Sequence, residues 1–442
     1  MNLIEALGQA MRIPELRKKL LFTVGLLMVF RILASISIPG ADKNALASLF
    51  NNNSLLGLLN LFSGGGLSTF SVVAMGVNPY INATIIMQLM TVVSVRLKEM
   101  AKEGEQGRKR ITRYTRWLTV ALGALQAYGL TVLFSSRSLP GGAVLPSPSA
   151  GTVIQIILVL TAGTIALMWL GELITEYGVG NGVSLVIFAG IIGRLPGSVY
   201  TYAQGGGSHI FQLVFISLIA VVVTAGIIEV QQAQRKIPIQ SAQRVINPRA
   251  GQAIQGRRSF LPLKVNAGGV IPIIFAISIM AFPTIFSNFF QNAGGRVGDF
   301  ANYIRNNWQP NGPSLLTNLL YNGIEFALIF GFTYFYTAVV FDPNDVADDF
   351  KKRSVYIPGI RPGRWTAEYL GRVMGRITLA GALFLAVITV VLPLATSFFT
   401  GVSTSSLYLG GTAVLIVVGV ALDTMQQIET QLLMRQYRGF IK

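Results

Sequence analysis

Long apolar segments alternate with polar connections along the whole chain. Most of them approach the roughly 20 residues that an α-helix needs to cross the hydrocarbon core of a bilayer. The runs are continuous and lack the period-2 alternation of barrel strands, so they predict helices. The ten segments cover residues 20–38, 70–93, 117–134, 152–171, 183–204, 211–229, 268–290, 315–341, 374–397 and 405–424. We therefore expect an all-α, polytopic membrane protein with ten transmembrane helices.

Composition agrees with this class. The 442 residues are 52% hydrophobic and only 12% charged, which is more apolar material than a soluble core would bury. Residues 1–19 contain Glu5 and Glu15 and no short apolar stretch with a small-residue cleavage site. We therefore expect no removable signal peptide, and the first span is retained.

Basic residues gather on one side of the predicted topology. Of 35 Lys and Arg residues, 29 lie in the two termini and in three alternating connections. These stretches hold 4 basic residues in 1–19, 8 in 96–116, 7 in 231–264, 7 in 342–376 and 3 in 425–442. Because Lys and Arg bias sets orientation, both termini are expected to be cytoplasmic.

Ten spans divide most simply into two halves of five. Residues 1–194 would form the first half, residues 195–210 an external Gly-rich hinge, and residues 211–442 the second half. An odd number of spans per half gives the two halves opposite orientations, which is the arrangement of inverted repeats. The pathway of such proteins usually lies at the interface of the repeats, near the midplane.

The segment at about 54–70 breaks the pattern. It is apolar for two turns, which is too short to span, and then reaches the three consecutive glycines Gly64 to Gly66. Irregular backbone at membrane depth is tolerated only where protein buries it or where it lines a cavity. The segment is either a short half-helix folded into the protein from outside or an amphipathic helix on the outer surface.

Two basic cytoplasmic connections, 231–264 and 342–376, are about 35 residues long each, far above the 2–8 residues usual between bundled helices. Alternation in Arg235–Gln240 and Ser259–Lys264 predicts a hairpin that projects into the cytosol. Such loops offer a docking surface for a large soluble partner. Anchoring against anionic lipid is the simpler alternative for their charge.

The sequence supports no enzyme. It contains no phosphate-binding loop, no H-E-x-x-H, no G-x-S-x-G and no carboxylate pair beside a base, and with no Cys and a single His209 we expect neither metal nor cofactor. Arg31 lies within the first span, where a structural partner or snorkelling explains a charge better than a substrate role. Scarce intramembrane charge favours a passive channel over the alternative of a secondary transporter with a small-solute site.

Nine ordered blocks extend over nearly the whole chain. They are FRILASISIPGAD (30–42), NLFSGGGLS (60–68), MGVNPYINATIIMQ (75–88), KEGEQGRKRITRYTR (102–116), MWLGELITEYGVGNGVSLVIFAGI (168–191), LPLKVNAGGVIPIIFA (261–276), YTAVVFDP (336–343), IPGIRPG (357–363) and GGTAVLIVVGVALD (410–423). With these blocks the chain resembles the SecY family, the channel subunit of the Sec protein translocon. The resemblance implies a plasma-membrane channel that passes unfolded secretory polypeptides and releases signal sequences and transmembrane helices laterally into lipid.

The resemblance also implies functional residues. Two halves would close like a clamshell on a ring of six aliphatic side chains, and a plug at about 54–70 would seal it. A lateral gate would lie between helices 76–93 and 268–288, although core hydrogen bonding is the alternative for its polar residues. The ring is Val77, Ile81, Val183, Ile187, Ile274 and Ile416; the plug includes Leu58, Asn60, Phe62, Gly64 and Gly65; the gate residues are Asn82, Gln88 and Asn266.

Partners follow from the same resemblance. The cytoplasmic loops would dock the motor ATPase SecA or the ribosome with its ribosomal RNA, Arg361 matching an arginine needed for this coupling. Arg257 and Arg258 match a basic pair at the hairpin tip, but NPRAGQAIQGRR is longer than the family's stretch, so Arg244 and Arg249 compete for that place. The other implied partners are SecE-like and SecG-like small membrane subunits, signal peptides and nascent chains, and anionic lipids.

Overall fold

The protein was analysed as a computed structural model. It describes residues 8, 11–42, 45–46, 60, 63–135, 144–145, 148–204, 207–241, 245–246, 253–254, 258–290, 295–308, 314–395 and 411–439. Within them the helices are α2 (Pro14–Ser35), α5 (Asn78–Val93), α6 (Val95–Lys102), α7 (Glu105–Ser135), α8 (Ala150–Tyr177), α9 (Gly182–Ile192), α10 (Leu195–Ala203), α11 (Gly207–Gln232), α12 (Ile271–Phe290), α13 (Arg296–Asn307), α14 (Leu315–Val340), α15 (Pro343–Lys352), α16 (Arg364–Ala386), the π-helical turn η1 (Val387–Val391) and α18 (Gly411–Gly439).

The structure is an all-α polytopic fold, as the hydropathy pattern predicts. Each of the ten predicted segments contains a helix. Six described helices are long and apolar enough to cross a membrane, or seven if α5 and α6, bent by 102° at their junction, count as one broken span. The apolar helices in α9 and α12 are shorter. The number of ten spans stays a prediction.

Local sequence fixes several helix ends. The Asn181 side chain accepts a hydrogen bond from the Ser184 amide and caps α9, and the Ser314 side chain forms a capping box at the start of α14. Such caps satisfy amides that the first helical turn leaves without partners. Pro79 occupies the first turn of α5, where a missing N–H costs nothing.

Two predicted segments differ in the structure. Ser71 forms an isolated β-bridge with Ser37, residues 72–77 form turns, and α5 begins only at Asn78, because positive φ at Gly76 interrupts any earlier helix. The segment 183–204 is divided at Gly193 into α9 and α10. Helix α10 therefore occupies most of the stretch that we expected to be a hinge loop.

The predicted hairpin is confirmed. Strands β1 (Gln234–Ser241) and β4 (Arg258–Lys264) pair antiparallel, with Arg235 opposite Leu263 and Pro238 opposite Phe260. A third strand, β5 (Val355–Tyr356), comes from the other long loop and pairs with β1, which the sequence did not predict. The strands β2 (Val245–Ile246) and β3 (Ala253–Ile254) form a separate pair.

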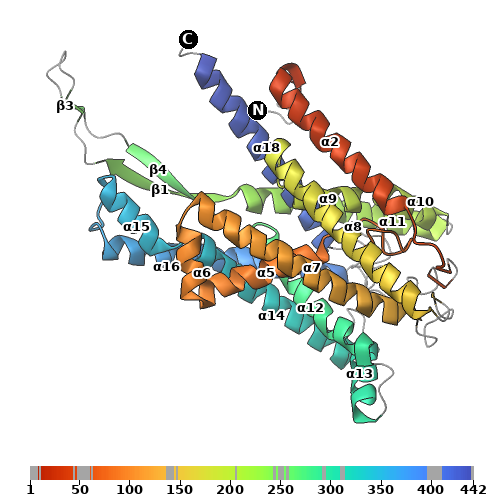
Figure 1. The fold of residues 1–442 in the computed structure, drawn as a ribbon. Helices are drawn as coiled ribbons and strands as arrows, with labels where there is room; N and C mark the ends of the chain where they lie inside the picture. The colour runs from red at the N-terminus through yellow and green to blue at the C-terminus, as the bar shows by residue number, and fades with distance from the viewer. Residues whose placement is uncertain are drawn as a thin grey trace.

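The hairpin and the second long loop share an apolar core. Ile237 and Leu263 of the hairpin pack with Ile357 and with Leu370 of α16, and all four are buried. Burying such a side chain contributes about 1.5–3 kcal/mol, so this cluster fixes the base of the sheet on the helices. Figure 1 shows the sheet projecting at one end of the bundle together with α15, while α13 lies at the opposite end.

The basic stretches contact one another. Lys264 at the end of β4 donates a hydrogen bond to Gln426 of α18, with 2.9 Å between Nζ and Oε1. Lys102 of α6 and Asp345 of α15 form an ion pair at 3.7 Å. Four of the five basic stretches therefore lie at the same end of the molecule.

Candidate functional site

Six aliphatic side chains from four helices belong to one extended apolar cluster, which also contains residues of α2, α8, α14 and α16. Helices α5 and α9 belong to the first predicted half, and α12 and α18 to the second. Five of the residues lie in the first two turns of their helices, and the sixth caps α5. Four are buried and the other two, Val183 and Ile274, are half-buried against them. The set is Val77, Ile81, Val183, Ile187, Ile274 and Ile416, all six of the predicted ring residues.

A glycine-rich turn adjoins this cluster. Of the predicted plug residues, Leu58 and Phe62 lie outside the described residues, whereas Asn60, Gly64 and Gly65 are described and buried. The Asn60 side chain and carbonyl close the turn by accepting from the amides of Ser68 and Gly65, each at 2.9 Å.

A glycine is required at position 64, where the turn lies closest to Phe30 and α9. Its φ is +64°, and a Cβ there would lie 2.6 Å from Cζ of Phe30 and 3.0 Å from Cα of Gly190. Phe30 belongs to the same apolar cluster as the ring. The glycine thus lets the turn seat directly against the cluster and against α9.

Two arginines that sequence reasoning did not place in the site contact this turn. Arg31 donates hydrogen bonds to the carbonyl oxygens of Gly64 at 3.0 Å and of Gly193 at 3.2 Å, which confirms that it has structural partners. Arg194 donates to the Ser68 hydroxyl. The only sequence signal was the isolated charge of Arg31 within an apolar span.

The predicted gate residues carry unsatisfied oxygens. Helices α5 and α12 are neighbours in the structure. Asn82 and Asn266 are buried and Gln88 is half-buried. Among the described residues, none of their three side-chain carbonyl oxygens has a hydrogen-bond partner, although the Asn266 amide donates to the Gly269 carbonyl at 2.9 Å. An unpaired buried polar group costs about 1–3 kcal/mol. The Asn266 amide makes a core hydrogen bond, and the gate role of the three residues stays a prediction.

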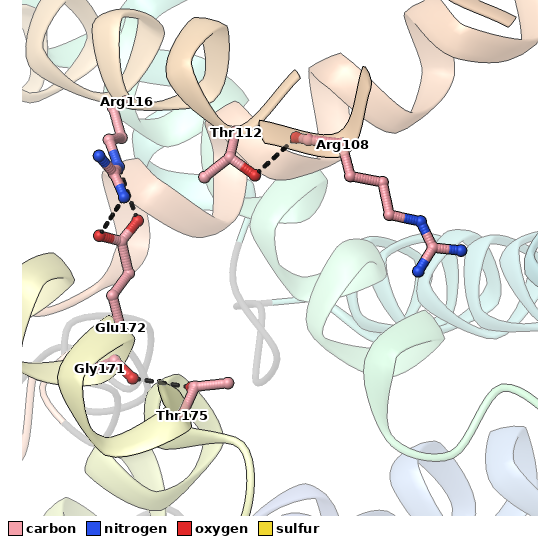
Figure 2. Close-up of polar contacts among 6 residues, drawn as sticks. All are labelled: Arg108, Thr112, Arg116, Gly171, Glu172 and Thr175. Carbon is pink, nitrogen blue, oxygen red and sulfur yellow. Dashed lines mark hydrogen bonds and ion pairs between the residues drawn. The ribbon is translucent and has the colours of Figure 1, made fainter. Parts of the chain in front are cut away.

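Figure 2 shows the ion pair that joins α7 and α8. The Arg116 guanidinium contacts both carboxylate oxygens of Glu172, at 2.9 Å from Nε and 2.8 Å from Nη2. One helical turn further, the Thr175 hydroxyl donates to the Gly171 carbonyl at 2.8 Å and accepts from the Gly182 amide at 2.9 Å. The ion pair thus joins α7 to α8, and the Thr175 hydroxyl links α8 to the first residue of α9.

The turn that precedes α9 is also held by the two terminal helices. The Gly180 amide donates to Oε1 of Gln427 in α18 at 3.0 Å, and the Val179 amide donates to the Thr23 hydroxyl in α2 at 3.1 Å. This turn carries Val183 into the apolar cluster. Helices from both halves therefore position one ring residue, and neither Thr23 nor Gln427 stood out in the sequence.

Arg361 is exposed and lies on the loop between β5 and α16. Its carbonyl accepts a hydrogen bond from the Thr366 hydroxyl at 2.9 Å, which fixes the backbone and leaves the guanidinium at the surface. The side chain borders an open cleft of about 530 Å³, lined by Gly359, Ile360, Arg361, Trp365, Glu368, Tyr369 and Arg372.

The hairpin tip is not assigned by the structure. Arg244, Arg249 and Arg257 lie outside the described residues. Arg258 is the first residue of β4 and pairs with Gln240 of β1. The competition between the two basic pairs stays open.

Comparisons with known proteins agree with this architecture. The SecY family model matches residues 71–425. Protein translocase subunit SecY of Halalkalibacterium halodurans is 44% identical over 451 residues, and that of Mycobacterium bovis is 42% identical over 453 residues, each covering 100% of both chains.

Solved structures share the fold at lower identity. A protein-conducting channel aligns with a TM-score of 0.64 at 17% sequence identity. A SecY channel whose plug domain is described as maintaining a membrane seal aligns with a TM-score of 0.63, also at 17% identity. Sec61 from a canine ribosome–channel complex of the endoplasmic reticulum aligns with 0.60 at 18%. Each alignment covers 97% of both chains.

The bundle of apolar helices around a shared aliphatic cluster defines a polytopic membrane protein. The family-model match and the full-length relatives place it more narrowly. The chain belongs to the SecY family and is a protein-conducting channel subunit of a protein translocase.

Proposed function

We propose that the six clustered aliphatic residues form the constriction through which unfolded secretory polypeptides pass. The observation that carries this proposal is that six residues at the starts of four helices, two helices in each predicted half, belong to one apolar cluster. A narrow apolar constriction excludes ions by dewetting and yields to a polypeptide that wedges it apart. The ring then acts as the ion seal of the resting channel.

The turn at 63–70 and the preceding residues form the plug. Its burial against Phe30 and α9 supports this assignment, and a structural neighbour is a SecY channel whose plug domain is described as stabilising the closed state. Displacement of the turn would uncover the ring from the side opposite the hairpin.

Signal sequences and membrane helices leave between α5 and α12. The three unsatisfied amide oxygens of Asn82, Gln88 and Asn266 support this exit. Such oxygens make the closed interface cost more than an apolar one, because each regains a partner only when water or a polypeptide backbone enters.

The cytoplasmic surface docks large partners. One structural neighbour is the channel of a ribosome complex, and the exposed loops at 231–264 and 342–376 carry 7 basic residues each. SecA engages Arg361, the ribosome and its RNA contact the hairpin, and SecE-like and SecG-like subunits and anionic lipids complete the assembly. The basic end faces the cytoplasm of a plasma membrane, with both termini on that side.

The constriction is tested by replacing Ile81, Ile187 and Ile274 together with Asn. We expect the wetted ring to give ion leak in planar bilayers without any substrate. A matched control replaces the exposed, outward-facing Ile154, Leu158 and Leu218 with Ala, which leaves the ring unchanged. Resting conductance equal to that of the parent in an assembled triple Asn variant would remove these residues from the seal.

A further inference from the structure

Two cationic side chains meet the glycine turn from different elements. Arg31 extends from α2, and Arg194 follows Gly193, the residue that ends α9. Arg31 bridges two carbonyl oxygens that are far apart in the sequence, that of Gly64 in the turn and that of Gly193. A planar guanidinium with a fork of donors can hold two acceptors at once.

The environment makes these bonds costly to break. Arg31 forms no ion pair with a described residue, and it lies within an apolar helix, where an unpartnered charge is expensive. One of its two carbonyls is at the C-terminal end of α9, where the helix dipole favours a cation. The Gly193 contact therefore orients the guanidinium, whose other hydrogen bond reaches the turn.

Arg194 contacts the same turn at Gly65, one residue after Gly64. A Cβ added at Gly65 would collide with Nε of Arg194, so this side chain packs directly over the glycine, whose φ is +95°. Its Nη2 donates to the Ser68 hydroxyl. The two arginines thus contact residues 64, 65 and 68, which spans the turn.

We propose that Arg31 and Arg194 are positioning residues that clamp the 64–68 turn in the closed channel, so that opening requires the release of both guanidinium groups. This proposal rests on the proposed function of the turn as a plug. The guanidinium of Arg31 stays on the Gly193 carbonyl when the turn leaves and is available to bind the turn again when the channel closes.

The absence of Cys from the sequence allows a direct measurement of turn release. Leu67 is buried within the turn, and Leu67→Cys introduces the only thiol. The reconstituted channel would be treated with a membrane-impermeant maleimide from the side opposite the hairpin. Loss of one hydrogen bond to a charged group changes an equilibrium by about tenfold, so we expect Arg31→Gln and Arg194→Gln each to accelerate labelling by about that factor.

Matched variants separate the clamp from general effects of charge. Arg296→Gln removes a cation from α13 without touching the turn and should leave the labelling rate unchanged. Arg31→Lys keeps the charge but loses the fork, so its rate should fall between those of the parent and Arg31→Gln. If Arg31→Gln does not assemble, Arg194→Gln and Ser68→Ala test the same clamp with the intramembrane charge intact.

Failure of the clamp and failure of the plug function give different results. If deletion of 57–67 raises resting conductance while the arginine variants label no faster than the parent, the clamp is wrong and the plug stands. If that deletion leaves conductance unchanged in an assembled channel, the plug function itself is wrong. Faster labelling of Arg296→Gln, equal to that of the two clamp variants, would also overturn the clamp.

Discussion

The substitution Gly64→Ala is the sharpest single test of the closed state. The added Cβ would lie 2.6 Å from Cζ of Phe30 and 3.0 Å from the backbone of Gly190, at a residue whose φ is +64°. Phe30 is 1% exposed and packed in the apolar cluster, and the other contact is to a helix backbone. Neither neighbour moves easily, so the turn itself must shift.

The expected destabilisation of the seated turn by Gly64→Ala is the sum of two free-energy costs. An L-residue in the left-handed region costs about 1–2 kcal/mol. Overpacking by a methyl group adds about 1–3 kcal/mol. Both terms act only on the seated turn, so the smaller sum of about 2 kcal/mol raises the ratio of displaced to seated turns by roughly 30-fold.

The assay is resting ion conductance in planar bilayers, together with thermal unfolding of the purified channel. Gly40→Ala is the matched control, because φ there is +94° but nothing lies within 4 Å of the added Cβ. It should lower thermal stability without changing conductance. Conductance and stability of Gly64→Ala equal to those of the parent would refute the seated turn.

Three other predictions concern the cytoplasmic face and the start of α9. Arg361→Glu should leave assembly and resting conductance intact and abolish ATP-driven export of a secreted precursor, with Arg361→Lys intermediate; normal export would contradict the docking role. Joint replacement of Arg257 and Arg258 by Gln should weaken ribosome binding and flatten its dependence on salt by roughly 1–2 in log–log slope, whereas an unchanged slope would move the tip to Arg244 and Arg249. Thr175→Val leaves the Gly182 amide without its acceptor and should lower the free energy of unfolding by about 1–3 kcal/mol, measured against the exposed control Thr430→Val; equal losses would contradict a special role of Thr175.

Helix existence and the hairpin were predictable because both follow from local patterns. A run of apolar residues near the thickness of a bilayer favours a helix, because lipid offers the backbone no hydrogen-bond partners. The alternation in Arg235–Gln240 and Ser259–Lys264 likewise encodes the paired strands β1 and β4. The ring residues were predicted on a different basis. Their i, i+4 spacing indicated only a shared helix face, and family resemblance was needed to single them out.

The sequence by itself determined the membrane class, the presence of a helix in each long apolar segment and the clustering of basic residues in the termini and alternating connections. The tertiary structure alone decided the break at Gly193, the addition of β5 to the hairpin, and the partners of Arg31 and Thr175. The physical reason is the range of the interactions involved. Hydropathy and capping act over a few neighbouring residues, whereas the Arg31 guanidinium meets the carbonyl of Gly193, 162 positions away, only after α2 and α9 have packed together.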